Sequence, residues 1–556
     1  MQEAAAIHVP GRQKELGAFY TPPVMAAVLT EWAVRSPGDR VLDPSFGGFV
    51  FLTAAHQRLR DLGASDTAIS DQLFGVDLDE DAHAAARADM GLALPAEQLI
   101  ERDFFEVAPR ELPAFDGVVG NPPYIRYQGF NGTAAKAREL AAEAGVSLTR
   151  LASSWAPFVI HATSFVAPGG RLAQVLPAEL MHAQYATEVV EFLRRSFGRI
   201  SIAVFEERVF PGALEDVVLL FAEGRGDAGL ADVRVIPCTT VADVEGGLAS
   251  TAGVVEGGIE GPVARGKLLG QLLPKQTREL YERLAAHDDV RRLGNVASVD
   301  IGVVTGANDF FVLSEGGASG LHDALLKPAV CKAAQVAGAR LSSEDHRNLL
   351  RSGQRGLMFV ANDRTPTESL QSARAHLKRG QQAGFHERYK CRTRDPWWAL
   401  PVPKHGAPGL LLTYCSHEHP RLALNEAGAL NTNTLHGVRP LDPTKAAALA
   451  AGFYNSLTLL SVELVGRSYG GGVLKLEPTE AEDVLLPSLV AGLEDLLPAV
   501  DRLIRRRDVE SALDLVDDVV LGSHLGLARD EIRRVRMGAQ QLSQRRRSRG
   551  KPPTRT

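Results

Sequence analysis

The sequence predicts an α/β fold, in which a mainly parallel sheet is covered by helices on both faces and is followed by a second domain of α+β structure. Over the first 225 residues, short apolar runs alternate with segments of helical length, and polar residues directly follow most of these runs. At 556 residues the chain is also too long for one ordinary core. Strands that alternate with helices indicate a parallel sheet, and ligands of such sheets bind beyond the carboxyl ends of the strands.

The strands expected in the first domain are short runs rich in apolar and β-branched residues. They span residues 40–42, 73–76, 98–100, 115–119, 171–176, 200–205 and 217–221. Helical periodicity extends over 155–166, where Pro168-Gly169-Gly170 is expected to stop it, and over 188–197. This alternation predicts a Rossmann-like sheet that is mostly parallel and has one antiparallel strand.

The pattern changes after the last of these strands. Residues 226–275 are rich in Gly, Val and Asp and have weak periodicity, which suits a domain connection. Residues 276–487 mix short strands, turns and helices, and residues 489–537 have a helical pattern. We therefore expect one domain over 1–235, a second over 236–487, and C-terminal helices with a basic tail over 488–556.

The bulk composition excludes several classes of protein. No stretch approaches the ~20 apolar residues that a membrane helix needs, and the first 16 residues contain no apolar signal segment. The four cysteines, Cys238, Cys331, Cys391 and Cys415, lie far apart without a CxxC pair, which argues against a disulfide framework or a zinc knuckle. We expect a reduced, cytoplasmic protein without a bound metal.

Positive charge is concentrated locally, although the net charge is −6. Residues 371–394 carry seven Lys and Arg against a single acid, Glu387, and residues 540–556 are basic without any acid. An acidic enzyme can hold a polyanion at such patches. For the last 15 residues, a solvated or disordered tail is the better interpretation.

The segment Asn121-Pro122-Pro123-Tyr124 follows the expected strand 115–119. Two consecutive prolines fix the backbone and remove two N–H donors, so the carbonyls there are available as acceptors. An Asn side-chain oxygen and a Pro carbonyl that accept both hydrogens of a conjugated amino group would localise its nitrogen lone pair. Tyr124 offers a ring on which a base can stack. A rigid turn without chemistry is the alternative.

Three acidic residues follow three successive expected strands. Asp43 precedes a Pro-Ser-Phe-Gly-Gly turn, Asp77 follows Gly75-Val76, and Asp103 precedes Phe104. A glycine turn after a strand lets the backbone approach a ligand, and an acid at the end of the next strand accepts ribose hydroxyls. Each acid alone is more often a helix N-cap, but three at successive strand ends favour a nucleotide-like ligand.

The order of these motifs resembles that of gamma-class, TaqI-like DNA adenine-N6 methyltransferases. The resemblance begins at 17–23 with Gly-Ala-Phe-Tyr-Thr-Pro-Pro, passes through Asp43, Asp77 and Asp103, and reaches Asn121–Tyr124. Segments 167–172, 301–308 and 470–478 also look like parts of that family's chain, the last two from its target-recognition domain. The resemblance implies a restriction–modification enzyme that transfers a methyl group from S-adenosyl-L-methionine to adenine N6 in a specific duplex sequence, after base flipping.

The resemblance also implies roles for individual residues. Thr21 would help to hold the methionine end of the cofactor, Asp77 its ribose, and Asp103 with a stacked Phe104 its adenine. The full set of cofactor-binding residues expected in this way is Tyr20, Thr21, Asp43, Pro44, Ser45, Gly47, Asp77, Leu78, Asp103, Phe104 and Asn121. The catalytic residues would be Asn121, Pro122, Pro123 and Tyr124. One departure is Phe49, which stands where the family usually has a second glycine, two residues after Gly47.

Residues 388–398 interleave basic and aromatic side chains, as a nucleic-acid surface requires. The residues expected to contact DNA are Arg388, Lys390, Arg392, Arg394, Trp397 and Lys475. For Trp397, packing into a core is an equally good interpretation.

Other functions fit parts of this pattern. The same tetrapeptide occurs in methyltransferases that act on glutamine amides of release factors, on guanine of ribosomal RNA or on cytosine N4. A DNA-binding specificity protein with a vestigial catalytic half is a further alternative. We expect no nuclease activity, because only 16 residues precede Gly17 and the region after 487 is short. The expected protein is a monomer that acts on double-stranded DNA at the nucleoid, without membrane association, while any cognate restriction or defence protein is encoded separately.

Overall fold

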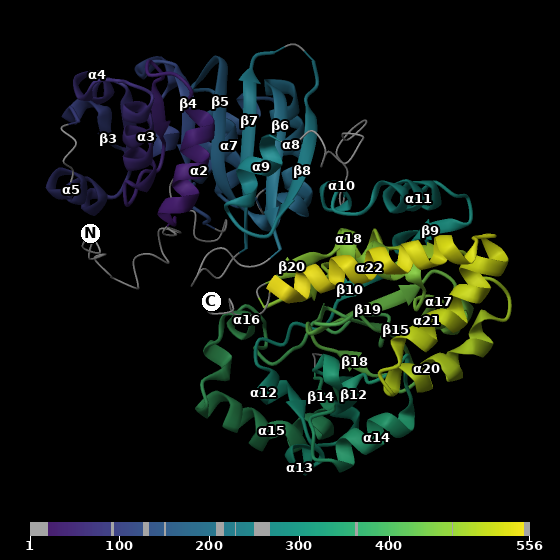
Figure 1. The fold of residues 1–556 in the computed structure, drawn as a ribbon. Helices are drawn as coiled ribbons and strands as arrows, with labels where there is room; N and C mark the ends of the chain where they lie inside the picture. Colours follow the sequence, from purple (N-terminus) through teal and green to yellow (C-terminus); the bar gives the residue numbers. More distant parts are fainter. Residues whose placement is uncertain are drawn as a thin grey trace. The chain divides into compact units, whose positions relative to one another are not determined.

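The computed structural model describes residues 21–89, 94–125, 133–149, 152–206, 216–227, 229–249, 267–361, 365–469 and 471–549. The chain forms two compact units, one of residues 1–275 with 548–556 and one of 276–547 (Figure 1). The boundary lies later than the expected position at 235, because strand β8 (Asp232–Cys238) completes the first sheet by pairing with β6 (Phe197–Phe205). Residues 488–547, which we expected to be a separate segment, belong to the second unit.

The first unit contains an eight-stranded sheet in the order β3-β2-β1-β4-β5-β7-β6-β8. The other strands are β1 (Val41–Asp43), β2 (Leu73–Asp77), β3 (Leu99–Glu101), β4 (Phe115–Gly120), β5 (Val166–Pro177) and β7 (Val217–Arg225). Strand β7 is antiparallel to both β5 and β6, and all other pairs are parallel. The predicted mostly parallel sheet with one antiparallel strand is confirmed. Because β1 lies between β2 and β4, the strand order reverses at β1/β4, which is where sheets of this kind bind ligands.

Helices cover both faces of this sheet (Figure 1). On one face pack α2 (Pro23–Ala33), α3 (Val50–Asp61), α4 (Asp66–Ser70) and α9 (Asp243–Ala249). On the other pack α6 (Ala134–Glu143), α7 (Trp155–Thr163) and α8 (Gln184–Ser196), while α5 (Glu80–Asp89) follows β2. Successive strand residues alternate between the two cores, as Leu42 and Val41 do, because neighbouring side chains in a strand point to opposite faces.

Two details differ from the sequence prediction. The helix expected over 155–166 ends at Thr163, because Val166 already pairs with Phe115 as the first residue of β5. Part of the segment 226–275, expected to be a connection, forms β8 and α9. Buried Val233 and Val235 of β8 join the core on one face and Ile236 joins the core on the other, so this segment extends the sheet.

The second unit has mixed α+β structure, as predicted, with four small sheets. Their strands are β10 (Ala297–Ile301), β19 (Leu435–Pro440), β15 (Leu410–Thr413), β17 (Leu422–Asn425) and β13 (Arg340–Leu341); β11 (Val312–Leu313), β14 (Leu357–Phe359), β12 (Leu326–Val330) and β18 (Leu430–Asn431); β16 (Cys415–Ser416), β21 (Val473–Lys475) and β20 (Arg467–Tyr469); and β22 (Leu485–Pro487) with β9 (Val290–Arg292).

The helices after residue 266 are α10 (Lys267–Gly270), α11 (Lys275–Ala285), α12 (Asn308–Phe311), α13 (Glu315–Ala318), α14 (Ser343–Arg351), α15 (Thr367–Gln382), α16 (Tyr389–Arg392), α17 (Ala446–Gly452), α18 (Ser456–Val465), α19 (Pro478–Glu482), α20 (Leu497–Arg505), α21 (Val509–Asp517) and α22 (Arg529–Arg549). In the described part of the chain no single helix is long and apolar enough to cross a membrane, and one bent pair, Pro443–Gly452 with Ser456–Val465, meets that measure only when its two helices are taken together.

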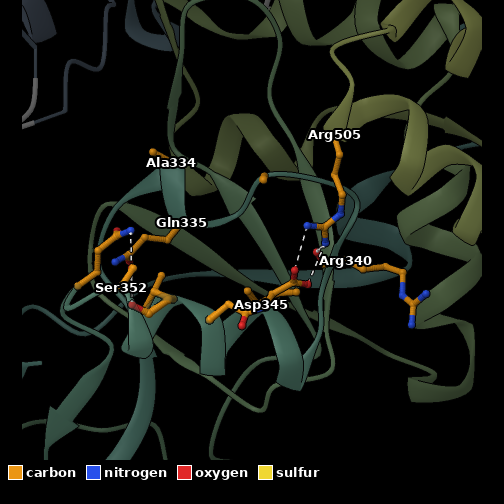
Figure 2. A pocket seen from close by; sticks show the side chains of 11 residues that line it. Ala334, Gln335, Arg340, Asp345, Ser352 and Arg505 are labelled. Carbon is orange, nitrogen blue, oxygen red and sulfur yellow. Dashed lines mark hydrogen bonds and ion pairs between the residues drawn. The ribbon is translucent and has the colours of Figure 1, made fainter. Parts of the chain in front are cut away.

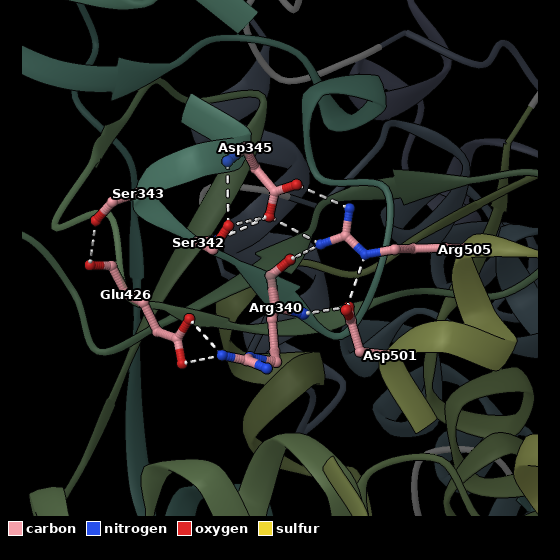
Figure 3. Close-up of polar contacts among 7 residues, drawn as sticks. All are labelled: Arg340, Ser342, Ser343, Asp345, Glu426, Asp501 and Arg505. Carbon is pink, nitrogen blue, oxygen red and sulfur yellow. Dashed lines mark hydrogen bonds and ion pairs between the residues drawn. The ribbon is translucent and has the colours of Figure 1, made fainter. Parts of the chain in front are cut away.

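A polar cavity of about 210 Å³ lies between α14 and the segment before β13 (Figure 2). The charged side chains on its wall are paired with carboxylates of the same unit. Arg505 binds Asp345 at 2.9 Å and Asp501 at 2.8 Å, and Arg340 binds Glu426 at 2.8 Å (Figure 3). The Arg505–Asp345 pair connects α20 to α14. The main chain of Arg340 connects α20 to β13, because its N–H donates to Asp501 and its carbonyl accepts from Arg505.

Arg546 of α22 is buried, although the basic C-terminal segment was expected to be a solvated tail. Its guanidinium forms a two-pronged ion pair with Glu463 of α18, at 2.7 and 3.0 Å, and it also donates to the main-chain carbonyls of His417 and Gly472. The side chains of Arg546 and Glu463 are 4% and 7% exposed. The end of α22 therefore anchors the turn between β20 and β21. Of the basic C-terminal segment, residues 550–556 lie outside the described part.

We predict that Glu463→Ala lowers the free energy of unfolding by about 3–5 kcal/mol, because it leaves the buried Arg546 cation without its counter-charge. Glu344→Ala is the matched control, since Glu344 pairs with Arg347 at a position where both side chains are more than half exposed, and exposed pairs contribute about 0–1 kcal/mol. Denaturant unfolding of both variants measures the difference. Equal effects of the two substitutions would contradict the structural role of Arg546.

Candidate active site

The predicted polar residues gather at the carboxyl ends of four adjacent strands of the first unit. Asp43 ends β1, Asp77 ends β2, Asp103 follows β3, and Asn121 follows β4. A direct hydrogen bond joins the first two strand ends, because the backbone N–H of Gly47 donates to Asp77 Oδ2 at 2.9 Å. The sequence prediction that these residues share one edge of the sheet is confirmed.

The side chain of Asn121 is held between two hydroxyl groups. Its Nδ2 donates to Thr21 Oγ1 at 3.1 Å, and its Oδ1 accepts from the Tyr124 hydroxyl at 2.7 Å. The Tyr124 hydroxyl also lies 3.0 Å from the carbonyl of Val175 in β5. On the main chain, Ser45 Oγ donates to the carbonyl of Asn121 at 3.2 Å. These contacts fix the plane of the carboxamide and leave Asn121 half-buried at the edge of the sheet.

Ser154 fastens the other end of the same loop, and sequence reasoning missed it. Its hydroxyl donates to the carbonyl of Pro123 and accepts from the N–H of Ile125 at 2.8 Å, while its own N–H donates to the carbonyl of Ile125 at 3.0 Å. Ser154 is 1% exposed. A serine before a helix indicates an N-cap, but the sequence does not show that this hydroxyl bonds a loop 31 residues earlier.

A second layer of hydrogen bonds positions Ser154. The neighbouring Ser153 donates to Glu179 Oε2 at 3.1 Å, and Trp155 Nε1 lies 3.4 Å from the same oxygen and 3.1 Å from the Tyr185 hydroxyl. Burial, followed by the nearby Glu179 carboxylate, raises the pKa of Tyr185 well above its usual value. Tyr185 therefore stays a neutral hydrogen-bond partner, and these contacts hold the first residues of α7 in place.

Asp43 is fully buried beside the loop. Its Oδ1 accepts from the N–H of Ser45 at 3.1 Å, and Oδ2 has no hydrogen-bond partner among the described residues. Burial raises the pKa of Asp43 to about 8. The hydrogen bond from the Ser45 N–H lowers this pKa, and the nearby charge of Asp77 raises it. Gly120 makes room for this carboxyl group, because a Cβ there would lie 2.9 Å from Asp43 Oδ1. The carboxyl group is therefore mainly protonated at neutral pH.

Asp77 and Leu78 present a polar group and an apolar group side by side. Asp77 Oδ1 accepts from the N–H of Asp79 at 2.8 Å, and burial raises its pKa. A carboxylate has about four acceptor positions, so its two backbone bonds orient Asp77 and leave acceptor capacity. Leu78 is 62% exposed, which is unusual for a leucine next to a buried strand.

Phe49 adopts a glycine-like backbone conformation. Its φ of 62° and ψ of 5° lie in the left-handed region, where it serves as the N-cap of α3. An L-residue with a side chain costs about 1–2 kcal/mol in that region. The ring is 7% exposed and packs on Phe46 with centroids 4.6 Å apart. Phe49 thus stands in a conformation that favours glycine, and apolar packing offsets the strain.

The structure corrects the expectation for Phe104. Its ring is 4% exposed and packs on Phe158, His161 and Phe165, so it is not available to stack on a ligand. His161 Nε2 lies 3.1 Å from the carbonyl of Phe104, and burial lowers the pKa of this histidine. Asp103 lies directly after β3, as predicted, and its Oδ1 accepts from the N–H of Phe105 at 2.9 Å.

Two further residues were predicted to bind the cofactor. Tyr20 lies outside the described residues, and Pro44 is buried.

The residues predicted to contact DNA divide into two groups. Arg388, Lys390 and Arg392 are exposed. Arg394 instead donates to the carbonyls of Thr305 and Val304, and Trp397 packs on Phe310 and Phe311. Lys475 pairs with Glu477 at 2.8 Å.

The last three residues thus have partners within the unit. This corrects the prediction for Arg394 and Trp397, because carbonyls and rings of the same unit already use these side chains. The role of Lys475 in DNA binding stays a prediction.

Comparison with known proteins identifies both halves of the chain. Residues 8–191 match the N-6 DNA Methylase family, and residues 265–521 match the C-terminal domain of the type II methyltransferase M.Eco57I. The chain carries an N-6 DNA methylase domain. These matches place it among the DNA methyltransferases of restriction–modification systems, and N-6 DNA methylases use S-adenosylmethionine as the methyl donor.

Characterised relatives align over most of this DNA methyltransferase. The type II methyltransferase M.XamI of Xanthomonas campestris pv. amaranthicola is 28% identical over 86% of this chain and 86% of its own length. M.AccI of Acinetobacter calcoaceticus is 21% identical over 84% of each chain. Among solved structures, the type IIG restriction endonuclease BpuSI aligns with 96% of this chain and 66% of its own, at 14% identity and a TM-score of 0.40.

We predict that Phe49→Gly is more stable than Phe49→Ala by about 1 kcal/mol, because both remove the ring but only glycine relieves the strain of the left-handed conformation. In an ordinary helix position alanine is the more stable residue by about the same amount. Denaturant unfolding of the two variants measures the difference. A more stable alanine variant would show that the backbone does not hold this conformation.

We predict that Ser154→Ala lowers kcat about 10-fold or more and leaves the Kd for DNA within about twofold, because the Pro123 carbonyl and Ile125 N–H lose buried hydrogen bonds worth about 1–3 kcal/mol. Ser164→Ala at the exposed end of α7 is the control, since Ser164 bonds only its own helix turn. A parallel loss of kcat and DNA affinity, or no loss at all, would contradict a role for Ser154 in positioning the loop.

Proposed function

We propose that the chain methylates the N6 amino group of adenine in a specific double-stranded DNA sequence, as the modification enzyme of a restriction–modification system. The observation that carries this proposal is the arrangement of Asn121. Its carboxamide is held in plane by Thr21 and Tyr124, and it is followed by two prolines that fix the backbone of the loop. Such a site suits a planar amino nitrogen, and the N-6 DNA methylase family match favours adenine.

The described residues fit S-adenosylmethionine at the ends of β1, β2 and β3. Asp77 would accept the ribose hydroxyls, exposed Leu78 would cover one face of the adenine, and Asp103 would accept its amino group. The buried Oδ2 of Asp43 has no hydrogen-bond partner among the described residues, and it belongs to the turn that would receive the methionine end. Bound there, the cofactor supplies an electrophilic methyl group on a positively charged sulfur.

The residues of the loop act on the amino group of the target base. Asn121 Oδ1 and the Pro122 carbonyl accept its two hydrogens, which localises the nitrogen lone pair and directs it towards the methyl group. Oδ1 has two lone pairs, so it can keep the Tyr124 bond while it accepts another. The ring of Tyr124 supports the face of the base. Catalysis then depends on orientation and fixed dipoles, without a covalent enzyme intermediate.

The target base has to leave the duplex to reach this loop, at a cost of a few kcal/mol. Exposed cations of the second unit, Arg388, Lys390 and Arg392, would hold the phosphates during this step. The proposal assigns modification alone to this chain and DNA cleavage to a separate protein. Magnesium-dependent cutting of DNA by the purified chain would contradict that assignment.

We predict that Asn121→Ala lowers kcat for methyl transfer by about 100- to 1,000-fold or more, the range found when one fixed polar group is removed from an active site. Its Kd for DNA should stay close to that of the wild type, since the loop does not hold the phosphates. Transfer of labelled methyl groups to DNA measures the rate. Gln57→Ala, on the exposed face of α3, should remain fully active, and equal labelling by wild type and Asn121→Ala would overturn the role of the loop.

A further inference from the structure

Six basic residues with exposed side chains lie near one another in the sequence of the second unit, on α15 and α16. They are Arg374, Lys378 and Arg379 on α15, followed by Arg388, Lys390 and Arg392 at α16. A short turn over Phe385–Glu387 contacts both helices and so connects them. We call these six residues with Tyr389 the α15–α16 surface.

These six cations differ from a set of other arginines of the same unit. Arg340, Arg347, Arg351, Arg355, Arg467, Arg505, Arg536 and Arg546 each form an ion pair with a carboxylate. No such pair involves the cations of the α15–α16 surface within the described residues. The acid of this segment, Glu387, lies 3.8 Å from His386. Within the described residues the surface thus carries positive charge outside any ion pair, and a polyanion is the partner that complements it.

Tyr389 is exposed and lies between Arg388 and Lys390 in the sequence. Its side chain is 64% exposed, more than Tyr469, the other exposed aromatic residue of the described chain, at 48%. Lys390 Nζ and Arg392 Cζ lie 5.5 and 5.6 Å from the centre of its ring. A ring this exposed contributes little to folding, whereas a ring beside cations is what stacks on nucleobases in nucleic-acid surfaces.

The helix that carries Tyr389 is firmly anchored. The adjacent Cys391 is fully buried, with Sγ 3.8 Å from the carbonyl of Thr305. Gly306 permits this contact, because its φ is +77° and a Cβ there would lie 2.7 Å from Lys390 Cβ. Arg394 fastens the following turn through the carbonyls of Thr305 and Val304. Tyr389 therefore projects from a rigid base, which lowers the entropy lost when its ring is immobilised on a ligand.

We propose that the α15–α16 surface binds target DNA in its opened state, with the six cations on phosphates and the Tyr389 ring stacked on a base that has lost its stacking neighbour. This inference rests on the proposed function, because base flipping is what creates such a base. It assigns different tasks to the two kinds of residue. The cations supply affinity that falls with salt, and the ring supplies affinity that depends on an unstacked base.

Fluorescence anisotropy tests this assignment with a duplex of the sequence that the protein methylates in genomic DNA, made with a mismatch or an abasic site at the methylated position. We expect Tyr389→Ala to weaken binding about 10- to 100-fold with an unchanged salt slope, and Tyr389→Phe to bind like the wild type. We expect Lys378→Ala and Arg392→Ala each to reduce the slope of log K against log salt by about 0.9. Arg347→Ala, an exposed arginine already paired with Glu344, is the control and should leave the slope unchanged.

Each other outcome counts against the proposal. Unchanged affinity of Tyr389→Ala would overturn the stacking role, and slopes unaffected by Lys378→Ala and Arg392→Ala would overturn the phosphate contacts. Tighter binding of RNA of equal length would point to a different partner. Failure of the proposed function is recognised separately, because the wild-type protein would then form no N6-methyladenine in DNA, whatever the result with Tyr389.

Discussion

The active site depends on the hydrogen bonds that hold the carboxamide of Asn121 between Thr21 and Tyr124. An asparagine side chain that turns freely would present its oxygen and its nitrogen equally, and only the oxygen can accept from an amino group. In the structure Nδ2 faces Thr21 and Oδ1 faces Tyr124, and the two hydroxyls hold the plane of the carboxamide in place. Thr21, just before α2, and Val175 of β5 join Asn121 through these bonds, so segments far apart in sequence must be in place together.

The contacts around the loop help to hold the carboxamide of Asn121 in place. Ser154 closes the loop from α7, and Glu179 with Tyr185 fixes the start of that helix. On the other side, Gly120 lets buried Asp43 approach β4, and Ser45 bonds the Asn121 carbonyl. A loop held at both ends loses little entropy when substrate binds, which is how a site without a covalent step gains rate.

Much of this arrangement follows from the sequence, because strand ends and turn residues carry local signals. The seven expected strands and the edge shared by Asp43, Asp77, Asp103 and Asn121 were predictable in this way. The burial of Phe104 was not, since a ring after a strand end can face either a ligand or a helix. Nor does sequence reveal that Arg394 and Arg546 satisfy carbonyls inside the second unit, because charge patterns do not identify partners distant in the chain. The gamma-class order of motifs remains a prediction.

The identity of the methylated base tests the central claim most directly. Purified protein is incubated with S-adenosylmethionine and unmodified genomic DNA, and the digested nucleosides are analysed by mass spectrometry. The family match predicts N6-methyladenine as the product, and the role proposed for Asn121 predicts that the wild type forms it and that Asn121→Ala does not. N4-methylcytosine, or methylation of protein or RNA in place of DNA, would contradict the account.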